Sequence, residues 1–421
     1  MIPIAIVSAI GGYVLAITIA KSSAPQKTVY DLPHDFRVTD ATFLPSALPG
    51  PPLTTGNRVD ILENGEQIFP AMLEAIGSAT KTVNFEAYIF WSGEVASRFR
   101  DAFAERASQG VQVRVLLDAV GSLESKLKPS DVEAMEKAGV RVEFFHKKKP
   151  WEIWVVNHRN HRRVLVVDGR IGFTGGVGFA DEWAGDADSP GHWRDTQVRV
   201  EGPAVRGLQR AFQENWSEAT GEPLVGEEFF PALPEVGSLS VAVVPSSSLA
   251  AMSGAGRLYA ISLSAAAQEI WIANSYFVPD EETTDLLVDA VQRGVDVRVI
   301  VPSDEHNDVP ATKAAGRAGY GPLLSGGVKI FEYEPTMFHL KTMVVDGIVS
   351  TVGSANLDSR SFHLNEEINL VVYDPSFAAE MRERYERDLA KCRPYTLEMW
   401  RARPLGKRIS EWLVRPFRSE L

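Results

Sequence analysis

Two stretches of this 421-residue chain carry the same chemically active side chains at the same spacing. Residues 157–176 read NHRNHRRVLVVDGRIGFTGG, and residues 338–356 read FHLKTMVVDGIVSTVGSAN. In each stretch a histidine is followed by a cation and then by an aspartate: His161, Arg163 and Asp168 in the first, and His339, Lys341 and Asp346 in the second. An isolated histidine is usually an ordinary surface or core residue, but a whole set that recurs indicates a function.

The spacing of histidine and cation favours joint binding of one ligand. On an extended strand, residues two apart project from the same face, so each histidine and its cation can meet one group together. Two imidazoles and two cations suit a phosphodiester, because one imidazole can attack phosphorus, the other can protonate the leaving group, and the cations can hold the oxygens. This chemistry requires no metal and no organic cofactor. Ser354 and Asn356 could add neutral donors to the phosphate in the second stretch.

The two aspartates have two interpretations. The apolar runs 164–167 and 342–345 predict strands that are buried on both faces. The dipeptides Asp168-Gly169 and Asp346-Gly347, which follow them, have the composition of a tight hairpin turn. Each aspartate is therefore either a turn residue or a direct participant in catalysis, and the sequence leaves both possibilities open.

The elements around these stretches also occur twice. A strand, a helix and a second strand are predicted at 82–90, 94–110 and 111–118, and again at 270–278, 281–294 and 295–302. We therefore expect an α/β fold of two duplicated halves, residues 57–221 and 238–392, each a mixed, mostly parallel sheet flanked by helices. Packing of the halves about a pseudo-two-fold axis would create one shared site, so a monomer would contain an internal pseudo-dimer.

Both ends of the chain suggest contact with a membrane. Residues 2–20 lack charge and are close to the ~20 residues that span a bilayer, so residues 1–21 are predicted to be a single transmembrane anchor, with a cleaved signal as the alternative. Residues 22–56 are predicted to be a linker, and Lys21 and Lys27 favour a body on the cytoplasmic side of the cell (inner) membrane. Residues 393–421 form a basic segment with interleaved aromatic residues, which is either a membrane-binding tail or a solvated surface helix.

Composition narrows the function further. With 45% hydrophobic and 23% charged residues the chain is typical of a globular protein. Its net charge of −12 argues against wrapping nucleic acid, and the single cysteine, Cys392, excludes an intramolecular disulfide. Asp304, His306 and Asp308 alternate in a manner that can look like metal ligands, but a loop with helix-capping residues explains them better.

The paired stretches resemble the H-x-K-x₄-D-x₆-G-[GS]-x-N motifs of the phospholipase D superfamily, and within it the bacterial cardiolipin synthases. The resemblance covers the chain from about residue 57 to residue 393, and the second stretch matches the motif fully. The first stretch has Arg163 where the family has lysine, and Gly178 where it has asparagine. Arginine is still a permanent cation, but glycine removes a donor.

The resemblance implies a phosphatidyltransferase that moves a phosphatidyl group between phosphatidylglycerol molecules through a phosphohistidine and releases glycerol. The alternatives are hydrolysis with water, as in a phospholipase D or a nuclease, and a non-catalytic phosphate-binding scaffold. Asp195 and Glu367 are implied to orient the two imidazoles, and the phosphate would be bound by Gly176, Ser354 and Asn356. The strand residues that this fold would bring near the site are Glu86, Tyr88, Asn274 and Tyr276.

Overall fold

The computed structural model describes residues 33, 35–40, 42–48, 50, 52–123, 126–146, 158–247 and 254–418. None of the helices within these residues has both the length and the apolar character needed to cross a bilayer. The predicted anchor, residues 1–21, lies outside the described residues.

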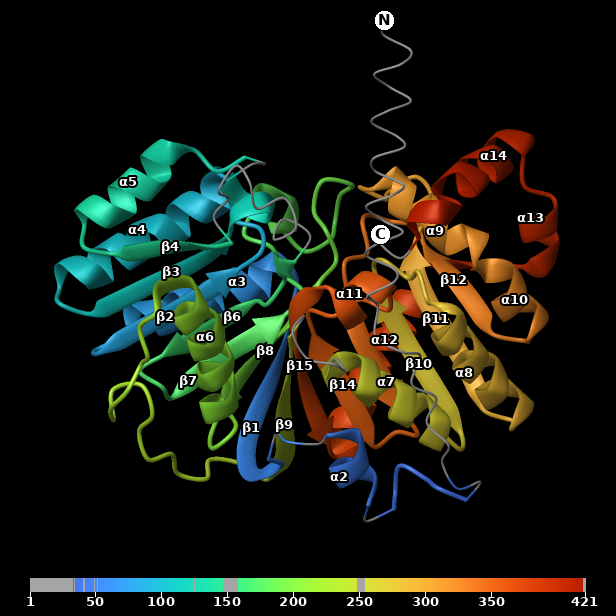
Figure 1. Cartoon of the computed structure of the whole chain (residues 1–421), viewed down its shortest axis with the longest axis horizontal. Coiled ribbons are helices and arrows are strands. Elements are labelled where there is room, and N and C mark those ends of the chain that lie inside the picture. Colours follow the sequence, from blue (N-terminus) through green and yellow to red (C-terminus); the bar gives the residue numbers. More distant parts are fainter. Residues whose placement is uncertain are drawn as a thin grey trace, which may run out of the picture. The chain divides into compact units, whose positions relative to one another are not determined.

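The two halves contain corresponding elements in the same order. The first half comprises β1 (Thr54–Glu63), α3 (Asn64–Gly77), β2 (Thr82–Ala87), α4 (Glu94–Ser108), β3 (Gln112–Asp118), α5 (Pro129–Lys137), β4 (Arg141–Phe145), β5 (Arg159–Asn160), β6 (Val164–Val167), β7 (Ile171–Gly175), β8 (Thr196–Glu201) and α6 (Val205–Thr220). The second comprises β9 (Leu239–Ser246), α7 (Gly254–Ala265), β10 (Glu269–Asn274), α8 (Glu281–Gln292), β11 (Asp296–Pro302), α9 (Pro310–Ala318), α10 (Tyr320–Ser325), β12 (Lys329–Tyr333), β13 (Lys341–Val345), β14 (Val349–Gly353), α11 (Ser359–His363), β15 (Asn365–Tyr373) and α12 (Pro375–Leu389). The duplication predicted from the sequence is confirmed (Figure 1).

The strands of both halves form one hydrogen-bonded path. Its order is β4-β3-β2-β6-β7-β8-β1-β9-β15-β14-β13-β10-β11-β12-β16, in which β16 is Cys392–Tyr395. Only β2-β3-β4 and β10-β11-β12, which helical crossovers connect, are parallel along this path. The expectation of a mostly parallel sheet is therefore wrong. Each half turns antiparallel at the strand that follows its histidine, since β6 runs antiparallel to β2 and β13 to β10, and tight hairpins then continue this direction into β7 and β14.

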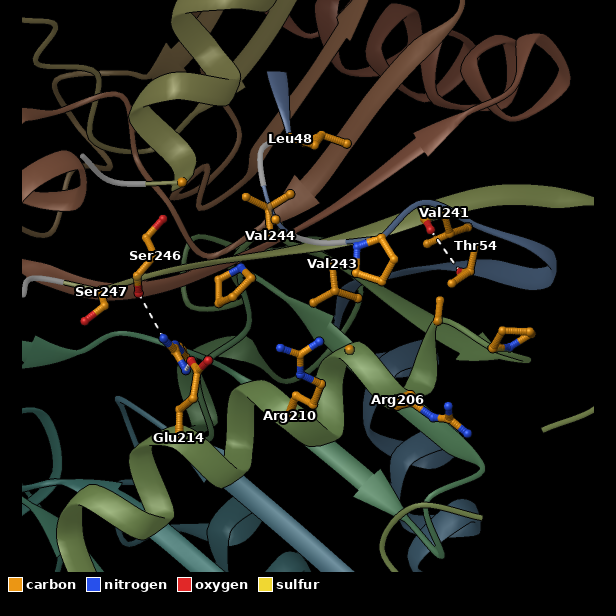
Figure 2. Close-up of a pocket in the computed structure, with 18 of the residues that line it drawn as sticks. Leu48, Thr54, Arg206, Arg210, Glu214, Val241, Val243, Val244, Ser246 and Ser247 are labelled. Carbon is orange, nitrogen blue, oxygen red and sulfur yellow. Dashed lines mark hydrogen bonds and ion pairs between the residues drawn. The ribbon is translucent and has the colours of Figure 1, made fainter. Parts of the chain in front are cut away.

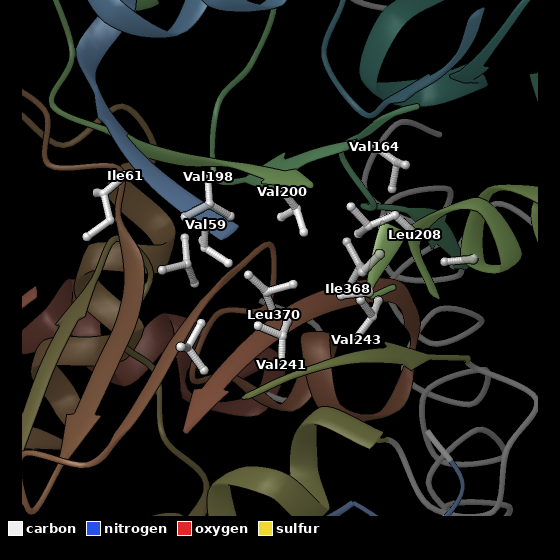
Figure 3. Packing of buried hydrophobic residues seen from close by; sticks show 14 of the residues in the cluster. Val59, Ile61, Val164, Val198, Val200, Leu208, Val241, Val243, Ile368 and Leu370 are labelled. Carbon is white, nitrogen blue, oxygen red and sulfur yellow. The ribbon is translucent and has the colours of Figure 1, made fainter. Parts of the chain in front are cut away.

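The halves are joined at β1 and β9 and share an apolar core. Val198 and Val200 of the first half lie in the same buried cluster as Val243, Ile368 and Leu370 of the second (Figure 3). Each of these five side chains is at most 5% exposed. Burial of large apolar side chains contributes roughly 1.5–3 kcal/mol each, so this cluster strongly favours the association of the two halves.

The boundaries of the body differ from those predicted. The linker expected at 22–56 includes α2 (Phe43–Ala47), in which Phe43 is fully buried, and Arg257 Nε of α7 donates to Ser46 O at 2.8 Å. The tail expected at 393–421 is docked as well. Its first residues pair with β12, and α13 (Leu397–Arg401) and α14 (Leu405–Val414) follow, with α14 against α9. The buried ring of Phe43 holds α2 to the body, whereas α14 is held by ion pairs of Glu411 and Lys407.

Candidate active site

Each motif histidine is held by a carboxylate from the other half. His161 Nδ1 lies 2.9 Å from Glu367 Oε1, and His339 Nδ1 lies 2.8 Å from Asp195 Oδ2. The backbone makes the same crossing, since His161 N donates to Glu366 O at 2.9 Å and His339 N donates to Arg194 O at 2.8 Å. Asp195 and Glu367 thus lie where the resemblance implied, and each carboxylate binds the histidine of the opposite motif.

The two cations lie at the outer nitrogens of the imidazoles. Arg163 Nη2 is 3.0 Å from His161 Nε2, and Lys341 Nζ is 3.0 Å from His339 Nε2. Lys341 also donates to Ser275 Oγ at 2.8 Å. These four motif side chains are buried. An anion placed between the imidazoles would therefore meet two positive charges where bulk water screens them weakly.

The electrostatics of the site favour neutral imidazoles. Burial, followed by the charge of Lys341, lowers the pKa of His339 to about 3. Burial and the charge of Arg163 likewise hold the pKa of His161 well below its usual value, and Lys341 adds to this effect across the two halves. Since each Nδ1 faces a carboxylate, the proton is assigned to Nδ1, which leaves the lone pair of Nε2 available as a nucleophile.

The ammonium group of Lys341 also has a low proton affinity. Burial lowers the pKa of Lys341 to about 7, and the nearby Arg163 contributes to the decrease. A bound phosphate would reverse this effect, because a negative charge stabilises the protonated amine.

The two carboxylates are held by different donors. Burial raises the pKa of Glu367 to about 7, although Ser354 and Asn365 donate to its oxygens. Burial opposes the charge on Asp195 as well, but His339 and Lys341 keep the pKa of Asp195 below its usual value. Asp195 also accepts from Trp183 Nε1 at 2.8 Å. The His339–Asp195 pair thus has the more firmly ionised carboxylate.

Trp183 explains why glycine is found at position 178. A Cβ atom on Gly178 would lie 2.8 Å from the Trp183 ring, so a larger residue has no room there. The same ring meets His339 edge to face, with 5.0 Å between ring centroids. The first half therefore lacks the motif asparagine but has an indole N–H that binds the carboxylate of the opposite histidine.

The three residues expected at the phosphate have different surroundings. A Cβ atom on Gly176 would lie 2.4 Å from Asp195 Oδ1, and its N–H donates to Thr196 O, so the glycine allows Asp195 to approach. Ser354 Oγ donates to Glu367 Oε2. Asn356 Oδ1 accepts from Ser275 Oγ at 3.0 Å, and its amide nitrogen has no hydrogen bond within the described residues. Of the three, Asn356 is the one with a donor available for a phosphate oxygen.

The two motif aspartates do not lie at the imidazoles. Asp168 and Asp346 are each seven residues beyond the histidine, at the far end of an extended segment that spans roughly 20 Å. Asp168 accepts from the N–H groups of Thr80, Lys81 and Thr82. Asp346 accepts from the corresponding residues Ala267, Gln268 and Glu269. Their catalytic assignment is corrected on this geometry: they are turn residues, with φ of 51° and 50°.

Aromatic rings surround the two imidazoles. Tyr88 packs edge-on against His161 at 4.9 Å between centroids, and Tyr276 does so against His339 at 5.8 Å. The segments that directly follow β2 and β10, which were expected to approach the site, thus supply one tyrosine each. Glu86 is farther back, where it accepts from Asn160 and Asn215.

Ser275, Trp183 and Trp193 were not expected at the site. Ser275 donates to Asn356 and receives from Lys341, and Trp193 lies 5.6 Å from His339 between ring centroids. The sequence indicated Ser275 only through its position between Asn274 and Tyr276, two residues that were expected near the site.

The acidic loop after β11 binds side chains of this chain. Asp304 pairs with Arg317 at 2.6 Å, and Asp308 accepts from Tyr276 OH at 2.8 Å. No group of three or more histidines, cysteines or acids that could hold a metal ion occurs in the part of the chain that the structure describes.

Comparisons with known proteins agree with this geometry. The family model described as "Cardiolipin synthase, PLD-like domain" matches residues 72–216 and 259–389. The cardiolipin synthase of Geobacillus thermodenitrificans is 35% identical over 367 residues, which cover 86% of this chain and 72% of that protein. The cardiolipin synthase of Oceanobacillus iheyensis is 34% identical over 362 residues, which cover 86% of this chain and 75% of that protein.

The fold also has a solved counterpart. The phosphatidylserine synthase of Haemophilus influenzae covers 89% of this chain and 98% of its own, with a TM-score of 0.64 at 15% identity, which is a likeness of fold. The duplicated halves and the paired histidines define a protein of the phospholipase D type. The chain belongs to the cardiolipin synthase family of phospholipase D-like proteins.

Proposed function

We propose that this chain is a phosphatidyltransferase of the phospholipase D type, which forms cardiolipin and glycerol from two molecules of phosphatidylglycerol. The observation that carries the proposal is the pair of buried imidazoles, each held at Nδ1 by a carboxylate and accompanied at Nε2 by a cation. The matching relatives are named cardiolipin synthase, which supports this choice of substrate.

The reaction takes two displacements at phosphorus. In the first, Nε2 of one imidazole attacks the phosphodiester, the bond from phosphorus to the glycerol oxygen breaks, and Nε2–H of the other imidazole protonates that oxygen. In the second, a hydroxyl group of another phosphatidylglycerol attacks the phosphohistidine and gives its proton to the second imidazole, and the N–P bond breaks. Arg163 and Lys341 stabilise the charged oxygens in both steps.

Binding of the negatively charged substrate favours protonation of the imidazole that acts as the acid in the first step. Without it, both imidazoles are neutral, because burial and the cations lower the pKa of each. A bound phosphodiester offsets the charges of Arg163 and Lys341, so the pKa of the imidazole that acts as acid increases toward neutrality. Either histidine meets the geometric requirement for the nucleophile.

We further propose that the enzyme works on the cytoplasmic surface of the cell membrane as a single chain with a complete site. One face of α14 supports membrane contact, since Leu405, Ile409, Trp412 and Leu413 are 70, 50, 70 and 56% exposed. The crossed pairing of histidines and carboxylates supports the single chain, because both halves of the site come from one polypeptide.

The deciding experiment is incubation of the purified chain with micelles of phosphatidylglycerol labelled in its terminal glycerol. Cardiolipin with free labelled glycerol supports transfer, phosphatidic acid without cardiolipin indicates hydrolysis, and lack of turnover indicates a scaffold. His339→Ala is expected to abolish the product and Arg163→Lys to retain it, because the lysine of the family motif keeps the cation. If Arg163→Lys proves as inactive as His339→Ala, the role given to Arg163 is wrong.

Quenching in alkaline denaturant, which preserves the acid-labile N–P bond, followed by mass spectrometry of peptides at neutral to alkaline pH identifies the nucleophile. We expect a phosphatidyl adduct on one histidine only, and loss of that adduct when the same histidine is replaced by alanine. Turnover without an adduct on either histidine would contradict the two-step reaction.

A further inference from the structure

A large groove is lined in part by Arg162, the residue between His161 and Arg163. Its volume is about 640 Å³, and it is bordered by α6, β9, the start of α7 and the segment around α2 (Figure 2). Its walls combine apolar side chains, among them Leu48, Val241 and Val243, with four arginines, Arg162, Arg206, Arg210 and Arg257. Glu214 is the one acidic residue among the described residues that line it.

Two of the arginines, Arg206 and Arg210, lie one turn apart on α6. Arg206, Arg210 and Glu214 follow one another at intervals of four on α6, so they share one face of the helix, and Arg210 projects from α6 toward Val243 on β9 (Figure 2). Arg206 and Arg210 are exposed to solvent and form no ion pair within the described residues. A row of cations opposite apolar strand residues is the composition of a site for an anionic amphiphile.

Arg162 forms the inner end of the groove. Its guanidinium is fully buried and donates to Ala211 O at 2.7 Å, Ser246 O at 3.0 Å and Glu366 Oε2 at 2.9 Å, whereas its Nε has no hydrogen bond within the described residues. Because side chains alternate along an extended chain, Arg162 projects away from the side of His161 and Arg163. A ligand in the groove would therefore lie behind the imidazoles and out of their reach.

We propose that this groove is a second binding site, which takes an anionic phospholipid of the membrane with its phosphate on Arg206 and Arg210. Arginine holds phosphate through two parallel hydrogen bonds, and the partly exposed lining residues Pro203, Leu233 and Pro245 offer apolar surface to the start of the acyl chains. The volume fits a headgroup and part of the chains, with the remainder toward solvent or membrane. This inference does not rest on the proposed transferase activity.

The test is the number of binding sites for a soluble anionic lipid. Isothermal titration of the full chain with dihexanoylphosphatidic acid, below its micelle concentration, is expected to give two sites per chain, one in the groove and one at the imidazoles. The double variant Arg206→Glu/Arg210→Glu should lose one site, because both phosphate contacts are replaced by repulsion. The matched control Arg98→Glu/Arg170→Glu makes the same change of charge at exposed arginines outside the groove and should keep both sites.

Three outcomes would overturn the proposal. Unchanged stoichiometry in Arg206→Glu/Arg210→Glu would place the second lipid elsewhere. One site in both the wild type and this variant would mean that the groove is closed, for instance by another segment of the chain. Equal binding of dihexanoylphosphatidylcholine or of inorganic phosphate at the groove would remove the need for an anionic lipid. Turnover of phosphatidylglycerol by the groove variant distinguishes failure here from failure of the proposed function.

Discussion

At the scale of single residues, the site depends on contacts that cross between the halves. Glu367 orients His161 and Asp195 orients His339, so a substitution in one half acts on the histidine of the other. The cations differ between the halves, because Arg163 is charged at any physiological pH whereas the pKa of Lys341 is lowered by burial to about 7. Anion binding by this site should therefore depend on the protonation of Lys341.

We expect the affinity for sulfate, whose charge is constant near neutral pH, to fall about tenfold per pH unit above about pH 7. The sign follows from the lowered pKa of Lys341: the free amine predominates above about 7, so binding must then include uptake of a proton. Lys341→Arg should flatten the curve, since arginine keeps its charge. Titration calorimetry across this range checks the prediction, and an unchanged slope in Lys341→Arg would contradict it.

Trp183 is a positioning residue in this arrangement. Trp183→Phe keeps a ring over Gly178 but removes the N–H that donates to Asp195. Loss of a hydrogen bond to a charged group costs about 1.5–3 kcal/mol, so kcat should fall roughly ten- to hundredfold with little change in KM. The pH profile of kcat should also shift, because the pKa of Asp195 increases when the donor is lost.

Trp91→Phe is the matched control for this substitution. Trp91 contacts the Trp183 ring, and its own N–H donates to Gly121 O at 2.8 Å, which lies outside the pair of imidazoles. If Trp91→Phe lowers kcat as much as Trp183→Phe, general loss of packing explains both, and the role given to the indole N–H is wrong.

At the scale of elements, the hairpins after β6 and β13 anchor the catalytic strands. Both central residues of the Asp168-Gly169 turn have positive φ, 51° and 64°, which is the backbone of the hairpin turns that Asp-Gly favours. The Asp168 side chain then fixes the turn to the segment before β2 through the N–H groups of Thr80 to Thr82. Asp346 makes the same connection to the segment before β10.

Asp168→Ala should therefore lower the free energy of unfolding by about 2 kcal/mol and leave kcat of the folded enzyme unchanged. Burial opposes ionisation of Asp168, but the N–H donors lower its pKa overall. The stability that it contributes is thus present above its ordinary pKa and is lost as the pH falls through the lower folded value. Urea titrations from neutral to acidic pH measure this difference, and a loss of kcat matching that of His339→Ala would restore the catalytic interpretation.

Local patterns predicted the elements well but not their partners. The strands and helices from Thr82 to Asp118 and from Glu269 to Pro302 follow from periodicity and from the glycines that end the helices. Strand direction in the rest of the sheet, and the crossing of Asp195 and Glu367, depend on contacts between residues far apart in the chain, which periodicity does not encode. Trp183 was not predicted at the site, because its contact with Gly178 is tertiary. In the sequence, Gly178 indicated only that the motif asparagine and its donor are missing.

At the scale of the whole molecule, α14 links the predicted membrane contact to the catalytic site. Glu411 on its inner face is buried and pairs with Arg317 and Arg403, each at 2.7 Å. Lys407 pairs with Asp304, on the loop whose Asp308 binds the hydroxyl group of Tyr276 beside His339. Ion pairs thus hold one face of α14 to the body, while its apolar face is exposed to solvent. The loop that contains Asp304 and Asp308 connects the helix to the site.

Replacing two residues of that face, Ile409→Ser/Trp412→Ser, should reduce binding to vesicles of phosphatidylglycerol at least tenfold. Insertion of large apolar side chains into a bilayer interface contributes more than the 1.4 kcal/mol to which a tenfold change corresponds, and the neighbouring basic residues add an attraction that salt weakens. Thermal unfolding should be unchanged, since Ile409 and Trp412 are exposed. Val225→Ser/Val236→Ser, which replaces exposed apolar residues outside α14, is the control and should bind as the wild type does. Sedimentation with vesicles measures both, and equal loss in the two variants would mean that general surface hydrophobicity, and not the face of α14, holds the protein at the lipid.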